Sequence, residues 1–413
     1  MEGFFNKSTL AAAKPTLGLV PYCELCQLYQ HCDSPKMSFS GEGRKKILIL
    51  GENPGYEESL KGIQFVGKTG RALEQYLRNL NIDMRRDCWL HNVVACRAAG
   101  RNKENRTPTD TEINHCRPLV TRTLKELKPE IVIPLGERAV KSLMGIVWKG
   151  EKVGLIGRWV GWKIPEQSFN MWICPNWHPS YIIRQKTQDP GTFPVLEKYF
   201  IRYLREAVNL KGRPWNEDGP PKPKIDVILN PRKAAEEIRG FIERGKMVAI
   251  DIETTKLKSD SEDGEIVCCS ISDGNKTIAY MWENEAIEAS VELFKSSVYK
   301  LGWNISFESK WIKKKAGCRV RNWLADGMLF QHIYDNRSGV CSLKFASFVR
   351  MGTPSYDEHI SPYLKAKGSN TANRIREVDI NELCSYCATD SFWEYKMNVL
   401  LMKELDYPFP EGE

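Results

Sequence analysis

The chain has 413 residues, of which 42% are hydrophobic, and a formal net charge of +8. A chain of this length and composition is globular and can form two or three domains, each with its own core. It contains no stretch of about 18 uninterrupted apolar residues, so no membrane-spanning segment is predicted. The mild positive charge permits a polyanionic partner without requiring one.

The cysteine content bears on the redox compartment. The chain starts without the basic and apolar regions of an export signal, so we expect a soluble cytoplasmic protein with no membrane partner. It has thirteen cysteines, an odd number scattered along the sequence. In such a protein they favour reduced thiols that bind a metal or cluster over a disulfide framework.

Strand-like apolar runs alternate with helical patterns through the first half. The strand-like runs are KKILIL, CWLHNVVA and EIVIPLG, and the helical patterns are GRALEQYLRNL, EINHCRPLVTRTLKEL and ERAVKSLMG. This alternation predicts an α/β fold with a mainly parallel sheet.

A segment rich in proline, glycine and charge, KGRPWNEDGPPKPK, follows residue 210. Such a composition suits a linker better than a packed core. Beyond it, the runs VAIDIETT, EIVCCSISD and KTIAYMW precede helical segments, so a second α/β domain is expected. The predicted boundaries are 1–210 for the first domain, 211–223 for the linker and 224–413 for the second domain.

The bend GENPG, directly after KKILIL, is the first candidate site element. In open α/β sheets, ligand-contacting residues gather beyond the carboxyl ends of strands. Asn92, late in CWLHNVVA, and His178, after MWICPNW, fit the same geometry. Gly51 and Gly55 allow close backbone approach and Pro54 stiffens the bend, so the loop can press against a flat ligand.

The first half resembles the family 4 uracil-DNA glycosylases, the iron-sulfur branch of that superfamily. The resemblance covers about residues 22–210 and is carried, in order, by CELC, GENPG, QFVGKTGR, HNVVACR, Cys116, IVIPLGERA and HPSY. It implies a uracil-DNA glycosylase-like α/β/α parallel sheet. It also implies hydrolysis of the N-glycosidic bond of a uracil flipped out of the DNA stack.

The resemblance implies a role for each pocket residue. Phe65 would stack on the flipped ring, and the Asn92 amide would match the uracil O4 and N3–H edge. His178 would donate a hydrogen bond to O2 as negative charge develops on the departing base. Gly51 would also contact the substrate, and Glu58 is expected to exclude thymine near its C5 position.

One residue of the bend departs from the family pattern. Asn53 stands where family 4 proteins usually have glycine or alanine, and related glycosylase families place a water-positioning Asp or Asn there. We therefore predict that Asn53 holds the hydrolytic water. Glu52 beside it is also predicted to be catalytic.

Cysteine spacing gives independent evidence for a metal centre. Cys23 and Cys26 form a C-x2-C pair, and nineteen residues separate Cys96 from Cys116. By count, four thiolates suit zinc or a 4Fe-4S cluster equally well. The family resemblance favours the 4Fe-4S cluster. The basic segment between the last two cysteines is expected to lie along DNA.

The second half has acidic residues at spacings that suit divalent ions. In VAIDIETT, Asp251 and Glu253 lie on one face because side chains alternate along a strand. Tyr386 and Asp390, in YCATD, are one helical turn apart and share a face as well. The run NISFES, which contains Glu308, lies between these motifs.

This half resembles the DEDDy 3'-to-5' exonuclease domain, especially the proofreading domain of family A DNA polymerases, over about residues 224–405. DIETT is the first motif, N-x-x-F-E the second and Y-x-x-x-D the third. The resemblance implies an RNase H-like (DnaQ-like) fold with two Mg²⁺ or Mn²⁺ ions. The implied ligands are Asp251, Glu253, Glu308 and Asp390. Tyr386 would orient the attacking water.

Glu308 departs from the family, which has Asp in the second motif. One extra methylene moves a carboxylate by about an ångström, and misplacement of that order can cost about 100-fold in rate. We therefore expect the exonuclease activity to be weakened.

Together the halves predict a DNA replication or repair enzyme that resembles the N-terminal part of certain phage DNA polymerases. No polymerase motif follows the last exonuclease helix, so we expect that this chain cannot extend DNA by itself. A fragment, a split subunit and a complete two-domain protein all fit. The expected partners are DNA, as single strands or 3' ends, and a DNA polymerase domain or subunit. If the protein is phage-encoded, its location would be the host cytoplasm.

A rival interpretation is a non-catalytic DNA-binding or docking module of a replisome, with one or both sites degenerate. Glu308 is the residue that supports this interpretation most.

Overall fold

The computed structural model describes residues 22–100, 104–149, 152–217, 219–368 and 371–410. These residues form two compact units. The division falls between Gly219 and Pro220, except that Val349–Pro354 group with the first unit.

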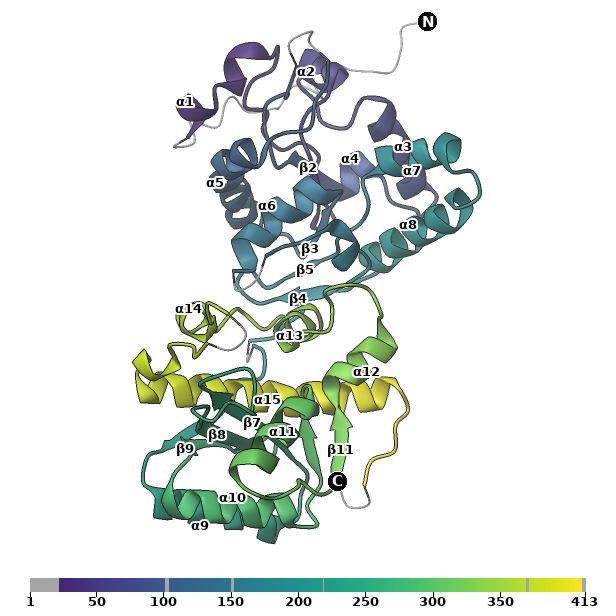
Figure 1. Cartoon of the computed structure of the whole chain (residues 1–413). Helices are drawn as coiled ribbons and strands as arrows, with labels where there is room; N and C mark the ends of the chain where they lie inside the picture. The colour runs from purple at the N-terminus through teal and green to yellow at the C-terminus, as the bar shows by residue number, and fades with distance from the viewer. Residues whose placement is uncertain (1–21, 101–103, 150–151, 218, 369–370, 411–413) are drawn as a thin grey trace, which may run out of the picture. The chain divides into compact units, whose positions relative to one another are not determined.

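A five-stranded sheet forms the centre of the first unit (Figure 1). Its strand order is β2-β1-β3-β5-β4, and all neighbouring pairs are parallel except β4 with β5. The strands are β1 (Ile47–Gly51), β2 (Cys88–Asn92), β3 (Ile131–Pro134), β4 (Ile164–Glu166) and β5 (Met171–Ile173). The helices are α1 (Cys23–Cys26), η1 (Leu28–His31), α2 (Tyr56–Lys61), α3 (Lys68–Arg78), α4 (Met84–Asp87), α5 (Asp110–Leu127), α6 (Glu137–Val147), η2 (Ile156–Arg158), α7 (Pro179–Gln188) and α8 (Phe193–Val208).

Strand β1 is buried along its whole length, as expected for a central strand covered on both faces. On one side, Ile47 and Ile49 belong to a core cluster that includes Leu73 of α3 and Phe200 and Leu204 of α8. A mainly parallel sheet packed against helices confirms the predicted α/β fold class.

The second unit contains a six-stranded mixed sheet in the order β11-β10-β7-β8-β9-β6. The strands are β6 (Ile225–Ile228), β7 (Val248–Thr254), β8 (Ile266–Ser272), β9 (Thr277–Met281), β10 (Lys300–Gly302) and β11 (Trp323–Asp326). The helices are α9 (Pro231–Arg244), α10 (Asn284–Lys295), α11 (Ile305–Lys315), α12 (Gly327–Tyr334), α13 (Leu343–Met351), α14 (Ser361–Leu364), η3 (Ile375–Glu377) and α15 (Ile380–Glu404).

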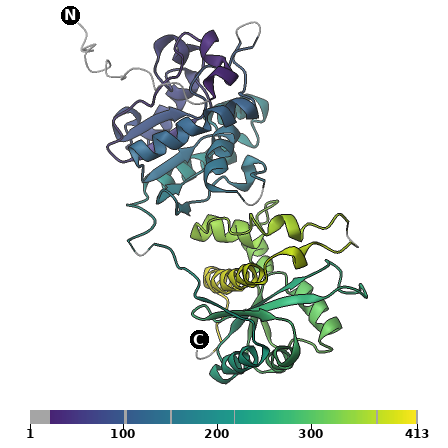
Figure 2. The same cartoon turned by 90° about the vertical axis from the view of Figure 1, so that its left-hand side faces the viewer.

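Helices cover both faces of this sheet (Figures 1 and 2). Val248, Ile250 and Ile252 of β7 belong to the core cluster that contains α9 and α10. Because side chains alternate along a strand, Asp251 and Glu253 point to the opposite face, which α15 covers. Strand β7 lies in the interior of the sheet, so its acidic residues are held away from the sheet edges.

Helix α15 has 25 residues and carries a stripe of buried polar side chains. These residues, spaced four apart and therefore on one face of the helix, are Tyr386, Asp390, Glu394 and Asn398. The stripe brings polar groups to the covered face of the sheet. Neither α15 nor any other helix in the described part of the chain is long and apolar enough to cross a membrane.

Candidate active sites

The first unit has a cavity of about 1000 Å³ where its parallel strands end. The predicted site residues that line it are Glu52, Asn53, Glu58, Phe65, Asn92 and His178. Glu52 follows β1, Asn92 is the last residue of β2, and His178 precedes α7. The fold thus brings to one cavity side chains that are far apart in the sequence.

Gly51, the last residue of β1, explains how closely two of these side chains approach the strand. A Cβ atom on Gly51 would lie 2.4 Å from Asn92 Oδ1 and 2.7 Å from Phe65 Cζ. Both distances are well inside van der Waals contact, so any side chain at this position would displace the amide and the ring. Gly51 therefore contributes by having no side chain, which leaves room for the Asn92 amide and the Phe65 ring beside β1.

Phe65 is held with a backbone φ of +56°, in the left-handed region that a bulky residue seldom adopts. The Arg85 guanidinium donates hydrogen bonds to the carbonyls of Gln64 (2.8 Å) and Phe65 (2.9 Å). On the other side, a Cβ on Gly70 of α3 would lie 2.1 Å from the Phe65 carbonyl oxygen. The strained backbone that aims Phe65 is thus fixed by Gly70 of α3 and by Arg85, and neither contact was predicted.

His178 is the N-cap residue of α7, with Pro179 at the first helical position. Its Nδ1 lies 2.6 Å from Ser180 Oγ and accepts a hydrogen bond from the Ser180 backbone N–H. Because Arg184 donates to Ser180 Oγ, the serine hydroxyl proton is available to Nδ1. Burial lowers the pKa of His178 to about 4. The imidazole is therefore neutral, with its proton on Nε2.

The remaining polar groups of the cavity differ in their hydrogen bonds and their burial. Asn92 is 5% exposed, and no described residue hydrogen-bonds its amide. Asn53 Nδ2 donates to the Pro54 carbonyl at 3.0 Å, and among the described residues nothing hydrogen-bonds its Oδ1. Burial raises the pKa of Glu52.

Glu58 connects the bend to the start of α3. Its Oε1 accepts a hydrogen bond from the Gly67 N–H at 2.7 Å, and a Cβ on Gly55 would lie 2.7 Å from its Oε2. The carboxylate therefore braces the two segments that flank Phe65.

The segment between Cys96 and Cys116 also contributes to the cavity, through Asn105, Arg106 and Thr107. Arg106 is paired with Glu112 at 2.5 Å. Residues 101–103 of this segment lie outside the described residues. That this segment lies along DNA stays a prediction.

Four cysteines, Cys23, Cys26, Cys96 and Cys116, line a second, small cavity. All four are free thiols, and the Cys96 sulfur accepts a hydrogen bond from the Lys36 N–H at 3.2 Å. The other residues around them are mostly aromatic or apolar: Tyr22, Leu28, Tyr29 and His115.

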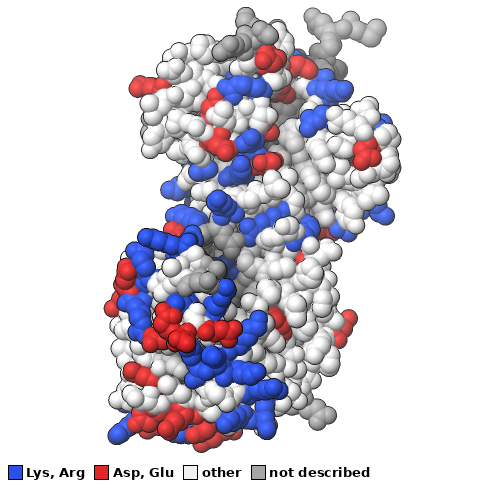
Figure 3. Space-filling model, viewed as in Figure 1, with Lys and Arg blue, Asp and Glu red and all other residues white. Residues whose placement is uncertain are grey.

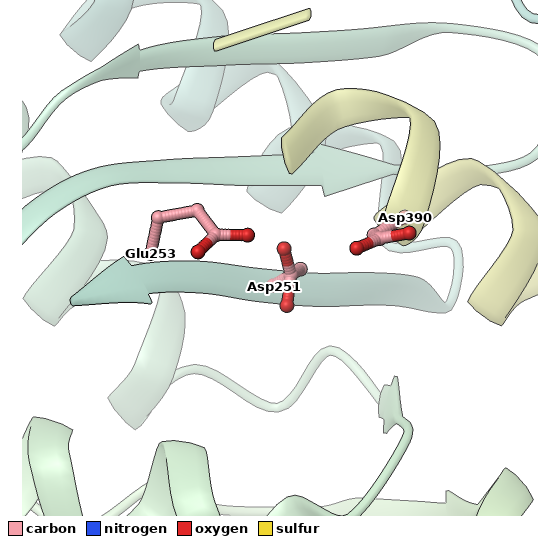
Figure 4. Close-up of side chains that lie close together, drawn as sticks. All are labelled: Asp251, Glu253 and Asp390. Atoms are coloured by element: carbon pink, nitrogen blue, oxygen red, sulfur yellow. The ribbon is translucent and has the colours of Figure 1, made fainter. Parts of the chain in front are cut away.

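In the second unit, Asp251, Glu253 and Asp390 converge (Figure 4). Their ligand oxygens all lie within 4.8 Å of one another. Burial raises the pKa of both Asp251 and Glu253, and neighbouring carboxylates raise them further. Hard divalent cations prefer such oxygen ligands and would offset this repulsion.

Glu308 lies in the first turn of α11 and is 3% exposed. It does not belong to the group whose oxygens lie within 4.8 Å of one another. Burial raises the pKa of its carboxyl, and the charge of Asp251 raises it further. The structure thus places Glu308 near Asp251 but apart from the three converging carboxylates.

Sequence reasoning missed three polar side chains of this site: Lys344, Tyr356 and Glu394. Lys344 Nζ donates to Tyr386 Oη at 2.8 Å, and Tyr356 Oη donates to Asp390. Glu394 could have been found, because it lies one turn after Asp390 on the same helix face. Lys344 and Tyr356 had no comparable signal.

Exposed lysines gather on α11, beyond the turn that carries Glu308. They are Lys310, Lys313 and Lys314. Figure 3 shows the positive side chains over this part of the second unit. Such a surface suits a phosphate backbone.

Comparisons with known proteins match both units. Residues 38–206 match the Uracil DNA glycosylase superfamily and residues 227–406 the 3'-5' exonuclease family. A type-4 uracil-DNA glycosylase of Saccharolobus solfataricus is 31% identical over 193 residues, which are 46% of this chain and 83% of that protein. A DNA polymerase of Bacillus phage SP01 is 27% identical over 226 residues, 52% of this chain and 22% of the polymerase. The structure of Escherichia coli RNase D aligns with a TM-score of 0.32 and 14% identity, covering 44% of this chain and 45% of RNase D.

The chain has a strand-end cavity in its first α/β unit and converging carboxylates in its second. Because the two units also match a uracil-DNA glycosylase and a 3'-5' exonuclease family, the chain is a DNA-processing enzyme. It belongs to the type-4 uracil-DNA glycosylase family and also carries a 3'-5' exonuclease domain.

Ser180→Ala should lower the rate of uracil release by about 5-fold, because the lost hydrogen bond to Nδ1 is worth about 1 kcal/mol. Without it, the His178 ring is less firmly held with its Nε2 proton toward the cavity. Single-turnover base release from a uracil oligonucleotide measures the effect. Thr187→Ala, at an exposed position on the same helix, is the control and should leave the rate unchanged; equal rates for both variants would contradict this role.

Proposed function

We propose that the chain hydrolyses the N-glycosidic bond of uracil in DNA and also removes nucleotides from DNA 3' ends. The observation that carries this proposal is that each unit gathers sequence-distant polar side chains at one place. We assign the first activity to a domain at 1–210 and the second to a domain at 224–413, joined by a linker at 211–223. The break between compact units at Gly219 and Pro220 supports this division.

In the glycosylase site, three side chains would bind the flipped base. Phe65 stacks on the pyrimidine ring, and the free Asn92 amide pairs with O4 and N3–H. His178 Nε2–H donates to O2, where charge develops as the bond to the sugar breaks. A neutral imidazole can fill this role because its Nδ1 accepts the Ser180 hydrogen bond, which leaves the ring proton on Nε2 as the donor.

We propose that Asn53 holds the hydrolytic water through Oδ1, since its Nδ2 is already engaged by the Pro54 carbonyl. Glu52, next to it, also faces the cavity and would assist at the same step. Glu58 would exclude thymine indirectly, by bracing the loop around Phe65, and Gly51 would keep Asn92 and Phe65 close.

In the exonuclease site, Asp251, Glu253 and Asp390 would hold divalent ions, with Glu308 as a further ligand on the Asp251 side. Bound Mg²⁺ or Mn²⁺ would supply Lewis-acid activation and neutralise charge on the scissile phosphate. Tyr386 would orient the attacking water from its place one turn before Asp390.

The four cysteines fit a 4Fe-4S cluster. The four thiols line one small cavity whose other residues are mostly aromatic or apolar. Their convergence from separate segments supports the cluster, whose role would be structural.

The similarity to a phage DNA polymerase supports a second element of the proposal. We propose that this chain works with a DNA polymerase domain or subunit, as proofreading requires. The polymerase would deliver the 3' ends on which the second unit acts.

The first test uses a 5'-labelled single-stranded oligonucleotide with one uracil, with and without magnesium. Alkali-labile breakage without metal reports the glycosylase, and a magnesium-dependent ladder from the 3' end reports the exonuclease. Asn92→Ala should abolish only the breakage, and Asp251→Ala only the ladder, so each variant controls for the other. Neither signal from the wild-type chain would instead support a non-catalytic DNA-binding module.

Asn53→Ala should lower turnover of the uracil oligonucleotide by about 100-fold, as loss of an acid-base or water-positioning group does. Affinity for the same oligonucleotide should be retained, because the binding side chains are unchanged. Asn79→Ala, at an exposed position, is the matched control. Unchanged turnover would remove Asn53 from the mechanism.

Protein purified without oxygen should be coloured, with broad visible absorption and about four irons per chain, as a 4Fe-4S cluster requires. Cys116→Ser should lose the colour, whereas Cys174→Ser, at a buried core position, should keep it. Colourless, zinc-containing protein would reject the cluster.

A further inference from the structure

We propose that Lys344 is a positioning residue of the exonuclease site, which holds the Tyr386 phenol so that its hydroxyl proton faces the reacting phosphate. This inference rests on the proposed exonuclease function. Lys344 lies outside the three acidic motifs, in the first turn of α13.

The contacts of Lys344 converge on the third motif. Its Nζ donates to Tyr386 Oη at 2.8 Å and lies 3.4 Å from Asp390 Oδ2. The ammonium also lies 4.9 Å from the centre of the Tyr386 ring. Tyr386 and Asp390 are more than nine-tenths buried, so water competes little for these contacts.

A second contact fixes the other side of the same carboxylate. Tyr356 Oη donates to Asp390 Oδ1, while Lys344 faces Oδ2. The ammonium also lies 5.3 Å from the centre of the Tyr356 ring. Lys344 therefore connects two tyrosines and an aspartate from different segments of the second unit.

The direction of the phenol proton follows from hydrogen-bond chemistry. A lysine ammonium can only donate, so the Tyr386 oxygen must act as its acceptor. The phenol O–H is then directed away from Lys344 and is free to donate to water or to a phosphate oxygen. A charged donor on the oxygen also polarises the O–H bond and strengthens that donation.

Lys344 has an alternative role, which is to neutralise negative charge. The positive charge of its ammonium lowers the pKa of Asp251 and of Glu253, and so partly offsets the repulsion between the carboxylates. The two roles differ in what they require. Positioning acts through the Tyr386 hydroxyl, whereas neutralisation does not need that hydroxyl.

Lys344→Met keeps most of the side-chain volume and removes the donor. It should lower kcat for a uracil-free, 5'-labelled oligonucleotide by about 100-fold, as loss of accurate positioning does, with little change in KM. Binding of Mn²⁺, followed by electron paramagnetic resonance, should be as tight as in the wild type or tighter, because a competing cation has been removed. Lys295→Met, at an exposed position on α10, is the matched control.

A double-mutant cycle separates the two roles. In a Tyr386→Phe background the hydroxyl is absent, so Lys344→Met should lower kcat by less than about twofold further. If the two losses multiply instead, Lys344 acts independently of the phenol and the proposal is wrong. Lys344→Gln serves the same cycle if the methionine variant does not fold.

Three other results would overturn the inference. Lys344→Met with wild-type kcat shows that the contact does not matter, and Lys344→Met that loses Mn²⁺ binding shows that the lysine maintains the carboxylate group itself. A wild-type chain that binds Mn²⁺ but never shortens the oligonucleotide contradicts the proposed exonuclease, and the role of Lys344 with it. If the wild-type chain and Lys344→Met shorten the oligonucleotide equally fast, only the role of Lys344 is contradicted.

Discussion

Burial of ionisable side chains is the constraint on which both candidate sites depend. An ion removed from water loses hydration worth several kcal/mol even after the protein relaxes, so a buried charge needs a partner or must be neutralised. In the first unit, burial keeps His178 neutral, with its pKa at about 4. In the second unit, Asp251 and Glu253 lie beside Asp390, whose negative charge opposes ionisation of both. Lys344 offsets part of this repulsion, and a divalent cation would offset more.

The two units place their buried polar and ionisable side chains in different ways. In the first, polar residues follow the carboxyl ends of parallel strands, where they leave the apolar sheet and border a cavity. His178 is the N-cap residue of α7, so the N-cap geometry also orients the imidazole. In the second, an internal strand supplies alternate residues and α15 supplies residues one turn apart, so the carboxylates meet between the sheet and the helix. A cavity suits a base drawn out of its stack, whereas a charged site between layers suits ions and a phosphate.

The position of Glu308 shows how a local departure acts within this scheme. Its side chain is one methylene longer than the aspartate expected there, and it lies apart from the three converging carboxylates. Glu394, one turn beyond Asp390, adds another buried carboxyl whose pKa burial raises. The second unit therefore holds more buried acidic groups than the three motifs imply.

Strands, helices and the acidic and glycine motifs could be predicted from the sequence, because periodicity and turn residues act over a few positions. The α/β class and the resemblance of each half to its family followed from local patterns in a given order. Tertiary structure alone decided the left-handed backbone of Phe65, which depends on Arg85 and Gly70, and the contacts of Lys344 and Tyr356 with the third motif. These depend on segments far apart in the chain that meet only when the layers pack. Spacing along a sequence carries no information about which distant side chain fills a given space, and packing decides that.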